Sequence, residues 1–180
     1  VARRSLASCG TQTAALSFGG YDSLAVTEKF DGSSWSTDAA WNLNTGRHSI
    51  AGCGTQTAAL SFGGYNSLVV TEKFDGSSWS TDAAWNLNTG RYSIAGCGTQ
   101  TAALSFGGYN GTYLAVTEKF DGSSWSTDAA WNLNTARERL ASCGTQTAAL
   151  SFGGYNGAYL AATEKFDGSS WSTDAAWNLN

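Results

Sequence analysis

The chain has 180 residues, of which 42% are apolar and 13% aromatic, and its formal net charge is −4. This composition is sufficient to build a packed core and excludes an intrinsically disordered chain. It argues against a nucleic-acid partner, because such proteins normally present a basic surface. No apolar run approaches the roughly 20 residues of a membrane-spanning helix, so we expect no membrane partner either.

Two stretches of the chain recur four times without change. The stretch CGTQTAALSFGGY begins at Cys9, Cys53, Cys97 and Cys143. The stretch TEKFDGSSWSTDAAWNLN begins at Thr27, Thr71, Thr117 and Thr163. Together they divide the chain into four units, 1–44, 45–88, 89–134 and 135–180. A period of this length indicates a repeat array such as a solenoid or a propeller, and we treat 1–180 as one domain.

In chain order, the unit 45–88 predicts four short strands and no helix. Residues 47–56 are mostly small and end in a turn signal. Along residues 57–62, Ala58, Leu60 and Phe62 share one face and Ala59 and Ser61 the other, which is the two-residue period of a strand. A Gly-Gly doublet at 63–64 ends this strand. Residues 68–74 are rich in β-branched side chains and predict a third strand. Asp75-Gly76 suits a type I′ turn, in which both central residues have positive φ, before a fourth strand at 77–81.

A lone sheet of this size cannot bury both of its faces, whereas stacked sheets share a core. The sequence therefore predicts an all-β fold, a β-propeller of four-stranded antiparallel blades with four blades in this chain. The small residues of the first strand suit the crowded axis, and Trp35 and its copies are expected to fill the gaps between blades. We expect unit 4 to pack on unit 1 and close the ring. A ring of eight blades shared by two chains, or an open array, are the alternatives.

The repeat resembles the kelch family. Kelch repeats carry a Gly-Gly doublet after the second strand, an aromatic-Asp pair closing the third, a Trp on the fourth and an Arg before the first. In this unit the matching residues are Gly63-Gly64, Phe74-Asp75, Trp79 and Arg47, and the other three units have the same matches. Two departures are the shorter gap between Phe74 and Trp79 and the Phe in place of the usual Tyr. The repeat also looks similar to kelch-like arrays of phage and metagenomic proteins. The resemblance implies a propeller.

Differences between the units cluster in two connections. One is the start of each unit, and the other follows Gly-Gly-Tyr, where units 3 and 4 are two residues longer. In an up-and-down sheet, the strand 4–strand 1 and strand 2–strand 3 connections lie on the same edge. We call this edge the varied rim and expect a partner to bind there, nearer units 3 and 4. The unchanging GTQT and DGSS turns form the constant rim.

Catalysis and metal binding have little support in the sequence. Galactose oxidase is a kelch propeller with copper, but a copper site needs several imidazoles and His48 is the one histidine here. No nucleophile-elbow motif is present. The four cysteines lack the paired spacing of zinc sites and are expected to be small packing side chains. We therefore expect a non-enzymatic protein without a cofactor.

The candidate binding residues are the arginine before each first strand and the tyrosines of the varied loops. They are Arg3, Arg47, Arg91, Arg137, Tyr21, Tyr65, Tyr109, Tyr113, Tyr155 and Tyr159. The four arginines need partners because Arg stays charged. The partner is either a repeated carboxylate, such as Asp38 or Glu28 and their copies, or an external anion held at the mouth.

The residues that directly follow these arginines would tune the same opening, and they are Arg4, His48, Tyr92 and Glu138. A tyrosine offers a flat apolar face with a polar end, which suits recognition. We expect a protein or glycan ligand bound by a monomeric ring or a homo-oligomer. A carbohydrate-binding adhesin is the alternative function, and an extracellular or virion-associated location is expected.

Overall fold

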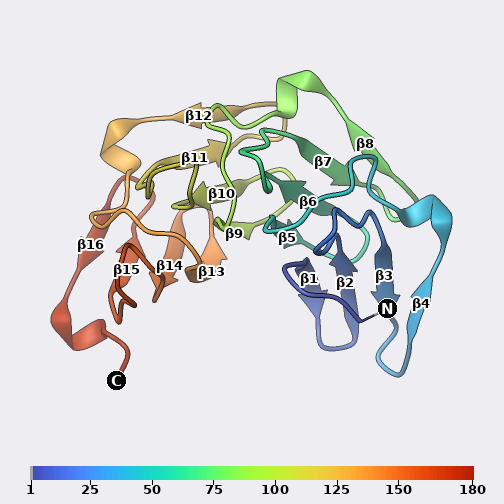
Figure 1. Cartoon of the computed structure of the whole chain (residues 1–180), viewed down its shortest axis with the longest axis horizontal. Helices are drawn as coiled ribbons and strands as arrows, with labels where there is room; N and C mark the ends of the chain where they lie inside the picture. Colours follow the sequence, from blue (N-terminus) through green and yellow to red (C-terminus); the bar gives the residue numbers. More distant parts are fainter. Residues whose placement is uncertain (1) are drawn as a thin grey trace.

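The computed structural model describes residues 2–180 and contains four antiparallel sheets of four strands each (Figure 1). In every sheet the strands are neighbours in chain order, so each repeat builds one blade from its own residues. This confirms the predicted all-β fold of four-stranded propeller blades. It also follows that no strand is exchanged between the blades.

The blades are numbered in chain order. Blade 1 consists of β1 (Ala7–Thr11), β2 (Ala14–Phe18), β3 (Thr27–Phe30) and β4 (Trp35–Thr37). Blade 2 consists of β5 (Ala51–Gly54), β6 (Ala59–Phe62), β7 (Thr71–Phe74) and β8 (Trp79–Thr81). Blade 3 consists of β9 (Ala95–Gly98), β10 (Ala103–Phe106), β11 (Thr117–Phe120) and β12 (Trp125–Thr127). Blade 4 consists of β13 (Ala141–Thr145), β14 (Ala148–Phe152), β15 (Thr163–Phe166) and β16 (Trp171–Thr173).

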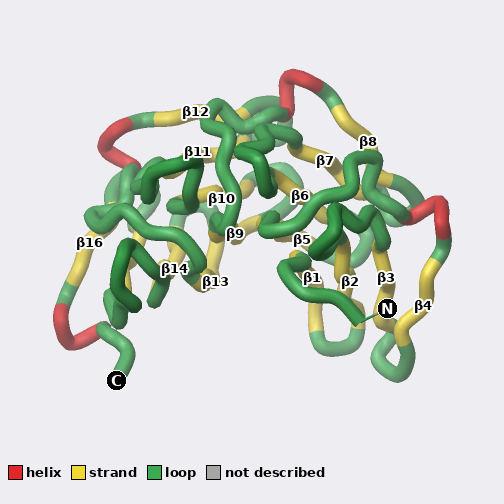
Figure 2. Tube along the Cα trace, in the orientation of Figure 1, coloured by secondary structure: helices red, strands yellow, loops and turns green. Residues whose placement is uncertain are grey.

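The blades surround a common axis, with the first strand of each blade innermost. Strand β1 packs against β5, β5 against β9, and β9 against β13. Figure 2 shows these four strands on the concave side and β4, β8, β12 and β16 on the outside. The hydrophobic core is divided into three clusters, each between two consecutive blades. In each cluster a Phe of one blade meets a Trp of the next, as Phe62 meets Trp125 at 5.0 Å between ring centroids.

The ring is incomplete, which corrects the expectation that unit 4 packs on unit 1. Blades 1 and 4 lie at the two ends of an arc (Figure 1). Trp79, Trp125 and Trp171 are each 5% exposed, because each packs on the blade before its own, whereas Trp35 is 51% exposed. Cys143 at the other end is exposed as well, while Cys53 and Cys97 are buried. The three interfaces fix the rotation from blade to blade, and four blades do not complete the turn.

Glycines allow the closest approaches between blades. Gly52 in β5 lies against the ring of Phe18, and a side chain at this position would collide with that ring. Gly63 has φ +70° and lies against the Ile94 side chain and the Arg91 carbonyl of the next blade. Blades 1 and 4 have Ser8 and Ser142 at the position of Gly52, so this position is small in every blade, which agrees with the small residues expected near the axis.

The DGSS turn differs from the expected type I′ geometry. Gly76 has φ +97°, but Asp75 is not among the residues with positive φ. The Asp75 carboxylate instead accepts hydrogen bonds from the amides of Ser77 and Ser78, both at 2.8 Å. The turn is therefore held by its aspartate side chain, a local pattern that competes with regular hairpin geometry.

The stretch after each fourth strand contains one helical turn that the sequence did not predict. These 3₁₀ turns are Ala39–Trp41, Ala83–Trp85, Ala129–Trp131 and Ala175–Trp177. Asp82 caps the second of them by accepting from the Ala84 amide. The Trp85 ring then lies under the Lys73 ammonium, 4.0 Å from the ring centroid. A three-residue turn is too short to leave a helical period in the sequence.

Candidate binding site at the varied rim

The four arginines before the first strands are structural in this fold. Arg47, Arg91 and Arg137 are buried and form ion pairs with Glu72, Glu118 and Glu164 at 3.1, 3.1 and 3.2 Å. Arg3 pairs with Glu28 at 2.8 Å. Of the two expected partners, the repeated carboxylate is present, and it is Glu28 and its copies rather than Asp38, which caps a 3₁₀ turn. The buried arginines expose no surface to a ligand at the rim.

Each of these arginines precedes the first strand of its blade and forms hydrogen bonds or ion pairs with the second strand and the residues after it. Arg91 donates to the carbonyl of Gly107 at 2.9 Å and to the hydroxyl of Ser105 at 3.0 Å. Burial lowers the pKa of Arg91 to about 10, and the neighbouring carboxylate of Glu118 opposes this shift. The guanidinium therefore stays charged at neutral pH and positions the chain where it enters β9.

The glutamates also join neighbouring blades. Glu118 accepts hydrogen bonds from the amides of Asn88 and Thr89 at 2.7 and 3.1 Å, and these two residues belong to the connection from blade 2. Glu72, Glu118 and Glu164 all lie in the interior. Buried carboxylates require charged or hydrogen-bonded partners, and these have both.

The two varied connections lie side by side on one rim, as the repeat pattern predicts. The amide of Tyr21 donates to the Arg4 carbonyl at 2.9 Å, and the amide of Tyr65 donates to the His48 carbonyl at 3.0 Å. In blades 3 and 4 the corresponding residues pair as short antiparallel bridges, Tyr92 with Tyr109 and Glu138 with Tyr155. Both connections of a blade therefore contribute to one surface.

A line of backbone hydrogen bonds runs around the axis on this rim. Ser49 donates to the Ser5 carbonyl at 2.8 Å, Ser93 to Ser49 at 2.8 Å and Arg139 to Ser93 at 2.9 Å. All four residues have positive φ, between 53° and 57°. This conformation is uncommon for residues other than glycine. No local signal in the sequence identifies these positions.

Aromatic side chains form a continuous row along the varied rim. Neighbouring ring centroids are 4.8 to 5.9 Å apart. The order of the row is Tyr21, His48, Tyr65, Tyr92, Tyr109, Tyr113, Tyr155 and Tyr159. It contains all seven tyrosines and the one histidine of the chain. We call it the aromatic row, and it crosses all four blades.

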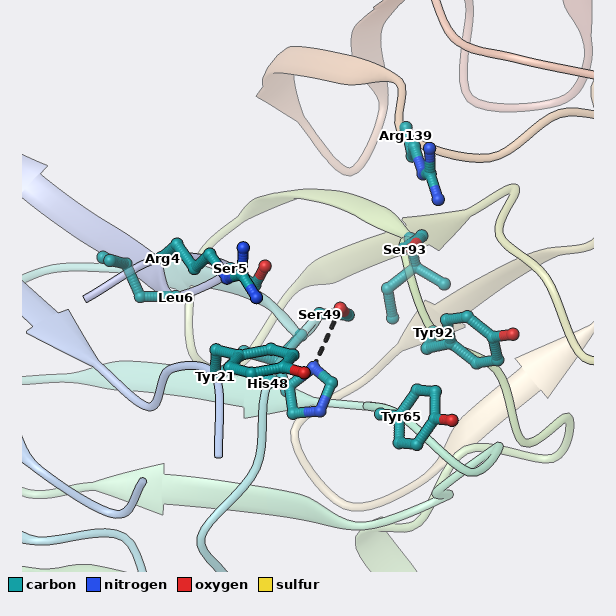
Figure 3. A pocket seen from close by; sticks show the side chains of 12 residues that line it. Arg4, Ser5, Leu6, Tyr21, His48, Ser49, Tyr65, Tyr92, Ser93 and Arg139 are labelled. Carbon is teal, nitrogen blue, oxygen red and sulfur yellow. Dashed lines mark hydrogen bonds between the residues drawn. The ribbon is translucent and has the colours of Figure 1, made fainter. Parts of the chain in front are cut away.

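Next to the aromatic row lies a hollow of about 540 Å³, open to solvent (Figure 3). Its wall includes Tyr21, His48, Tyr65 and Tyr92, together with two arginines from opposite ends of the arc, Arg4 and Arg139. A second hollow of about 490 Å³ adjoins it beside Tyr21, His48 and Tyr65. These two hollows are lined mainly by residues of units 1 to 3, with Arg139 of unit 4 in the wall of the first. That a ligand binds nearer units 3 and 4 stays a prediction.

The side chains of this site offer both flat faces and charge. The Arg4 guanidinium lies 4.0 Å above the centroid of the Tyr21 ring, and the Arg139 side chain is 67% exposed. Glu138 lies near Arg139, 3.5 Å from its Nε, and is itself buried. His48 stacks on Tyr65, and its Nδ1 lies 3.1 Å from the Ser49 hydroxyl. Burial raises the pKa of Tyr92 and Tyr113, so both hydroxyls are neutral donors at physiological pH.

The sequence-predicted residues divide into two groups. The six tyrosines predicted as binding residues lie at the varied rim, and so do Arg4, His48 and Tyr92. The four repeated arginines lie below it in the blades. Arg139 and the serines of the backbone line were missed, because their role depends on which blades become neighbours around the axis.

The constant rim presents groups that satisfy one another. Hydrogen bonds from the Ser77 hydroxyl and from the amides of Ser77 and Ser78 lower the pKa of the Asp75 carboxyl to about 2. Within residues 2–180, no three His, Cys, Asp or Glu side chains gather as a metal would require. Over the same range, no helix is long and apolar enough to cross a membrane.

No protein-family model matches this chain, and no curated protein matches it.

Proposed function

We propose that the chain is a non-enzymatic binding module that recognises a protein or glycan ligand through the aromatic row on the varied rim. The observation that supports this is the placement of every tyrosine and the one histidine in a single row beside an open hollow. Tyrosines supply large contact areas at low conformational cost and are enriched in recognition surfaces. Propellers are also commonly binding or scaffold modules.

A carbohydrate ligand is the second candidate. Exposed tyrosine faces can stack on the apolar face of a sugar ring, and Tyr21 and Tyr65 are 44% and 48% exposed. Arg4 and Arg139 would suit a carboxylate or phosphate group on the same ligand. The proposal includes membership of the kelch family and an extracellular or virion-associated location. Both rest on the repeat motifs alone.

Screening the 180-residue chain against a glycan array and a displayed peptide library tests the proposal. For any ligand found, Tyr65→Ala and His48→Ala should weaken binding by about tenfold or more each, because buried aromatic contacts dominate recognition. Ser77→Ala on the constant rim is the matched control and should leave the affinity unchanged. If Ser77→Ala abolishes binding while Tyr65→Ala and His48→Ala leave it unchanged, the ligand binds on the constant rim and the assignment of the binding surface is wrong.

A further inference from the structure

All three blade interfaces use the same two faces. The forward face of blade 3 presents Cys97, Leu104 and Phe106 from β9 and β10, together with Leu133 from the connection after β12. The back face of blade 4 presents Leu140, Ala149, Phe166 and Trp171. The corresponding residues form the other two interfaces. Each blade thus carries one forward face and one back face that fit each other.

The polar contacts across the interfaces repeat as well. The indole Nε1 of Trp171 donates to the Thr117 hydroxyl at 3.1 Å, and Lys119 donates to the Gly168 carbonyl at 2.5 Å. The side chain of Gln146 donates to the carbonyls of Ala103 and Phe120 at 3.0 and 2.6 Å. Both other interfaces contain the same set of bonds.

The two ends of the arc leave one face of each kind uncovered. On the back face of blade 1, Trp35 is 51% exposed. On the forward face of blade 4, Leu179 is 52% exposed, and a hollow of about 300 Å³ lies beside Cys143, Leu150 and Lys165. Among residues 2–180, the side-chain donors of Gln12, Trp35 and Lys165 make none of the cross-blade hydrogen bonds that their copies make.

We propose that these two open faces bind each other between copies of this chain, head to tail. The proposal rests on continuity with the three interfaces inside the chain. The back face of blade 1 has Leu6 where that of blade 4 has Leu140, and the forward face of blade 4 has Leu179 where that of blade 3 has Leu133. Trp35 of one copy would therefore pack on Phe152 of the next and donate to Thr163, as Trp171 does to Thr117. Lys165 would reach the Gly32 carbonyl in the same way.

Head-to-tail contacts build rings or open chains, depending on whether the rotation closes. One chain does not close its own ring. Two chains contain eight blades, which is within the usual range for propellers, so a ring of two chains is the smallest closed product.

Light scattering after size exclusion, over a range from micromolar to near-millimolar concentration, tests the pairing. The wild-type chain is expected to exceed the monomer mass of 18.8 kDa as the concentration rises. Trp35→Ala should weaken the association by about 30-fold, since a buried tryptophan at an interface is a typical hot spot. Trp35 is half exposed in the single chain, so this variant is expected to fold. Ser77→Ala, which changes an exposed residue on the constant rim of blade 2, away from both open faces, is the control and should associate like the wild type.

Thiol labelling shows which surface is covered. Cys143 is exposed in the single chain and occupies the forward-face position at which Cys97 is buried. Its alkylation should slow as the wild-type chain associates, and Trp35→Ala should restore the fast rate. A protein that stays monomeric at the highest concentration overturns the proposal. So does an association that leaves Cys143 reactive or that Trp35→Ala does not weaken.

Discussion

Trp35 and Trp125 occupy the same position of the same repeat, yet their environments differ. Eighteen identical residues surround each of them, from Thr27 and from Thr117. Trp125 is 5% exposed between Phe62 and Phe120, whereas Trp35 is 51% exposed and contacts Phe30 of its own blade. Burial in this protein is therefore a property of neighbouring blades, and the repeat sequence alone does not determine it.

The comparison shows how the stability of the array is distributed. In repeat proteins, stability is approximately a sum of intrinsic terms for each repeat and interface terms between neighbours. Blades 2 and 3 have two interfaces each, and blades 1 and 4 have one. The same substitution should then cost more inside the array than at its ends, and the predictions below test this at concentrations where the chain is monomeric.

The tryptophans should give the largest difference. Trp125→Ala removes a buried ring and its hydrogen bond to Thr71, so we expect it to lower the free energy of unfolding by about 3 to 5 kcal/mol. Trp35→Ala should cost about 1 kcal/mol or less, as is usual for exposed positions. Urea denaturation followed by circular dichroism measures both values. Equal losses would show that the open face is covered within the single chain.

Breaking a buried ion pair should cost about 3 kcal/mol. Glu118→Ala leaves the Arg91 guanidinium buried without its carboxylate and also removes the acceptor of Asn88 and Thr89. Thermal unfolding measures the effect. The double variant Arg91→Met with Glu118→Leu should recover part of the loss, because the uncompensated charge is gone. If the double variant is less stable than Glu118→Ala, the cost of the single variant does not come from the unpaired charge.

The glutamines should show a smaller difference of the same kind. Gln100→Ala removes two donors that bridge to the carbonyls of Ala59 and Phe74 in blade 2, so we expect a loss of about 1 to 2 kcal/mol. Gln12→Ala is the matched control at the end of the array and should be nearly neutral. Chemical denaturation of both variants in parallel decides the point. A Gln12 variant that is as destabilised as the Gln100 variant would contradict the nearest-neighbour account.

The cysteines should give the smallest effect on stability. Replacing Cys53 or Cys97 with Ala removes one buried sulfur and should cost about 1 kcal/mol or less, and Cys143→Ala should be neutral. Burial raises the pKa of Cys9 and of Cys97 to about 12, so both thiols stay protonated at pH 8. Iodoacetamide at that pH should modify Cys143 first, and mass spectrometry of digested samples identifies the site. Faster modification of Cys97 than of Cys143 would contradict the burial of the inner thiols.

The strands and the two rims could be predicted because the relevant signals are local. Alternation at Leu60 and Phe62 gave the strand, the Gly-Gly doublet gave its end, and the repeat period gave the blade. The 3₁₀ turn at Ala83–Trp85 and the side-chain-held turn at Asp75 were not predicted, since each depends on a few hydrogen bonds with no periodic pattern. At the site, the tyrosines could be found from the sequence, whereas the positive-φ line through Ser49 and Arg139 could not.

Four similar β-sheets, their order along the chain and the rim on which they differ can be read from the amino-acid sequence. These features follow from contacts within one repeat, and the repeat is written four times. The burial of each arginine against a glutamate, the single row of tyrosines and the open ring emerge from the packing of the folded chain. Those outcomes depend on the rotation from one blade to the next, which is set by packing between residues more than 40 positions apart, such as Phe62 and Trp125.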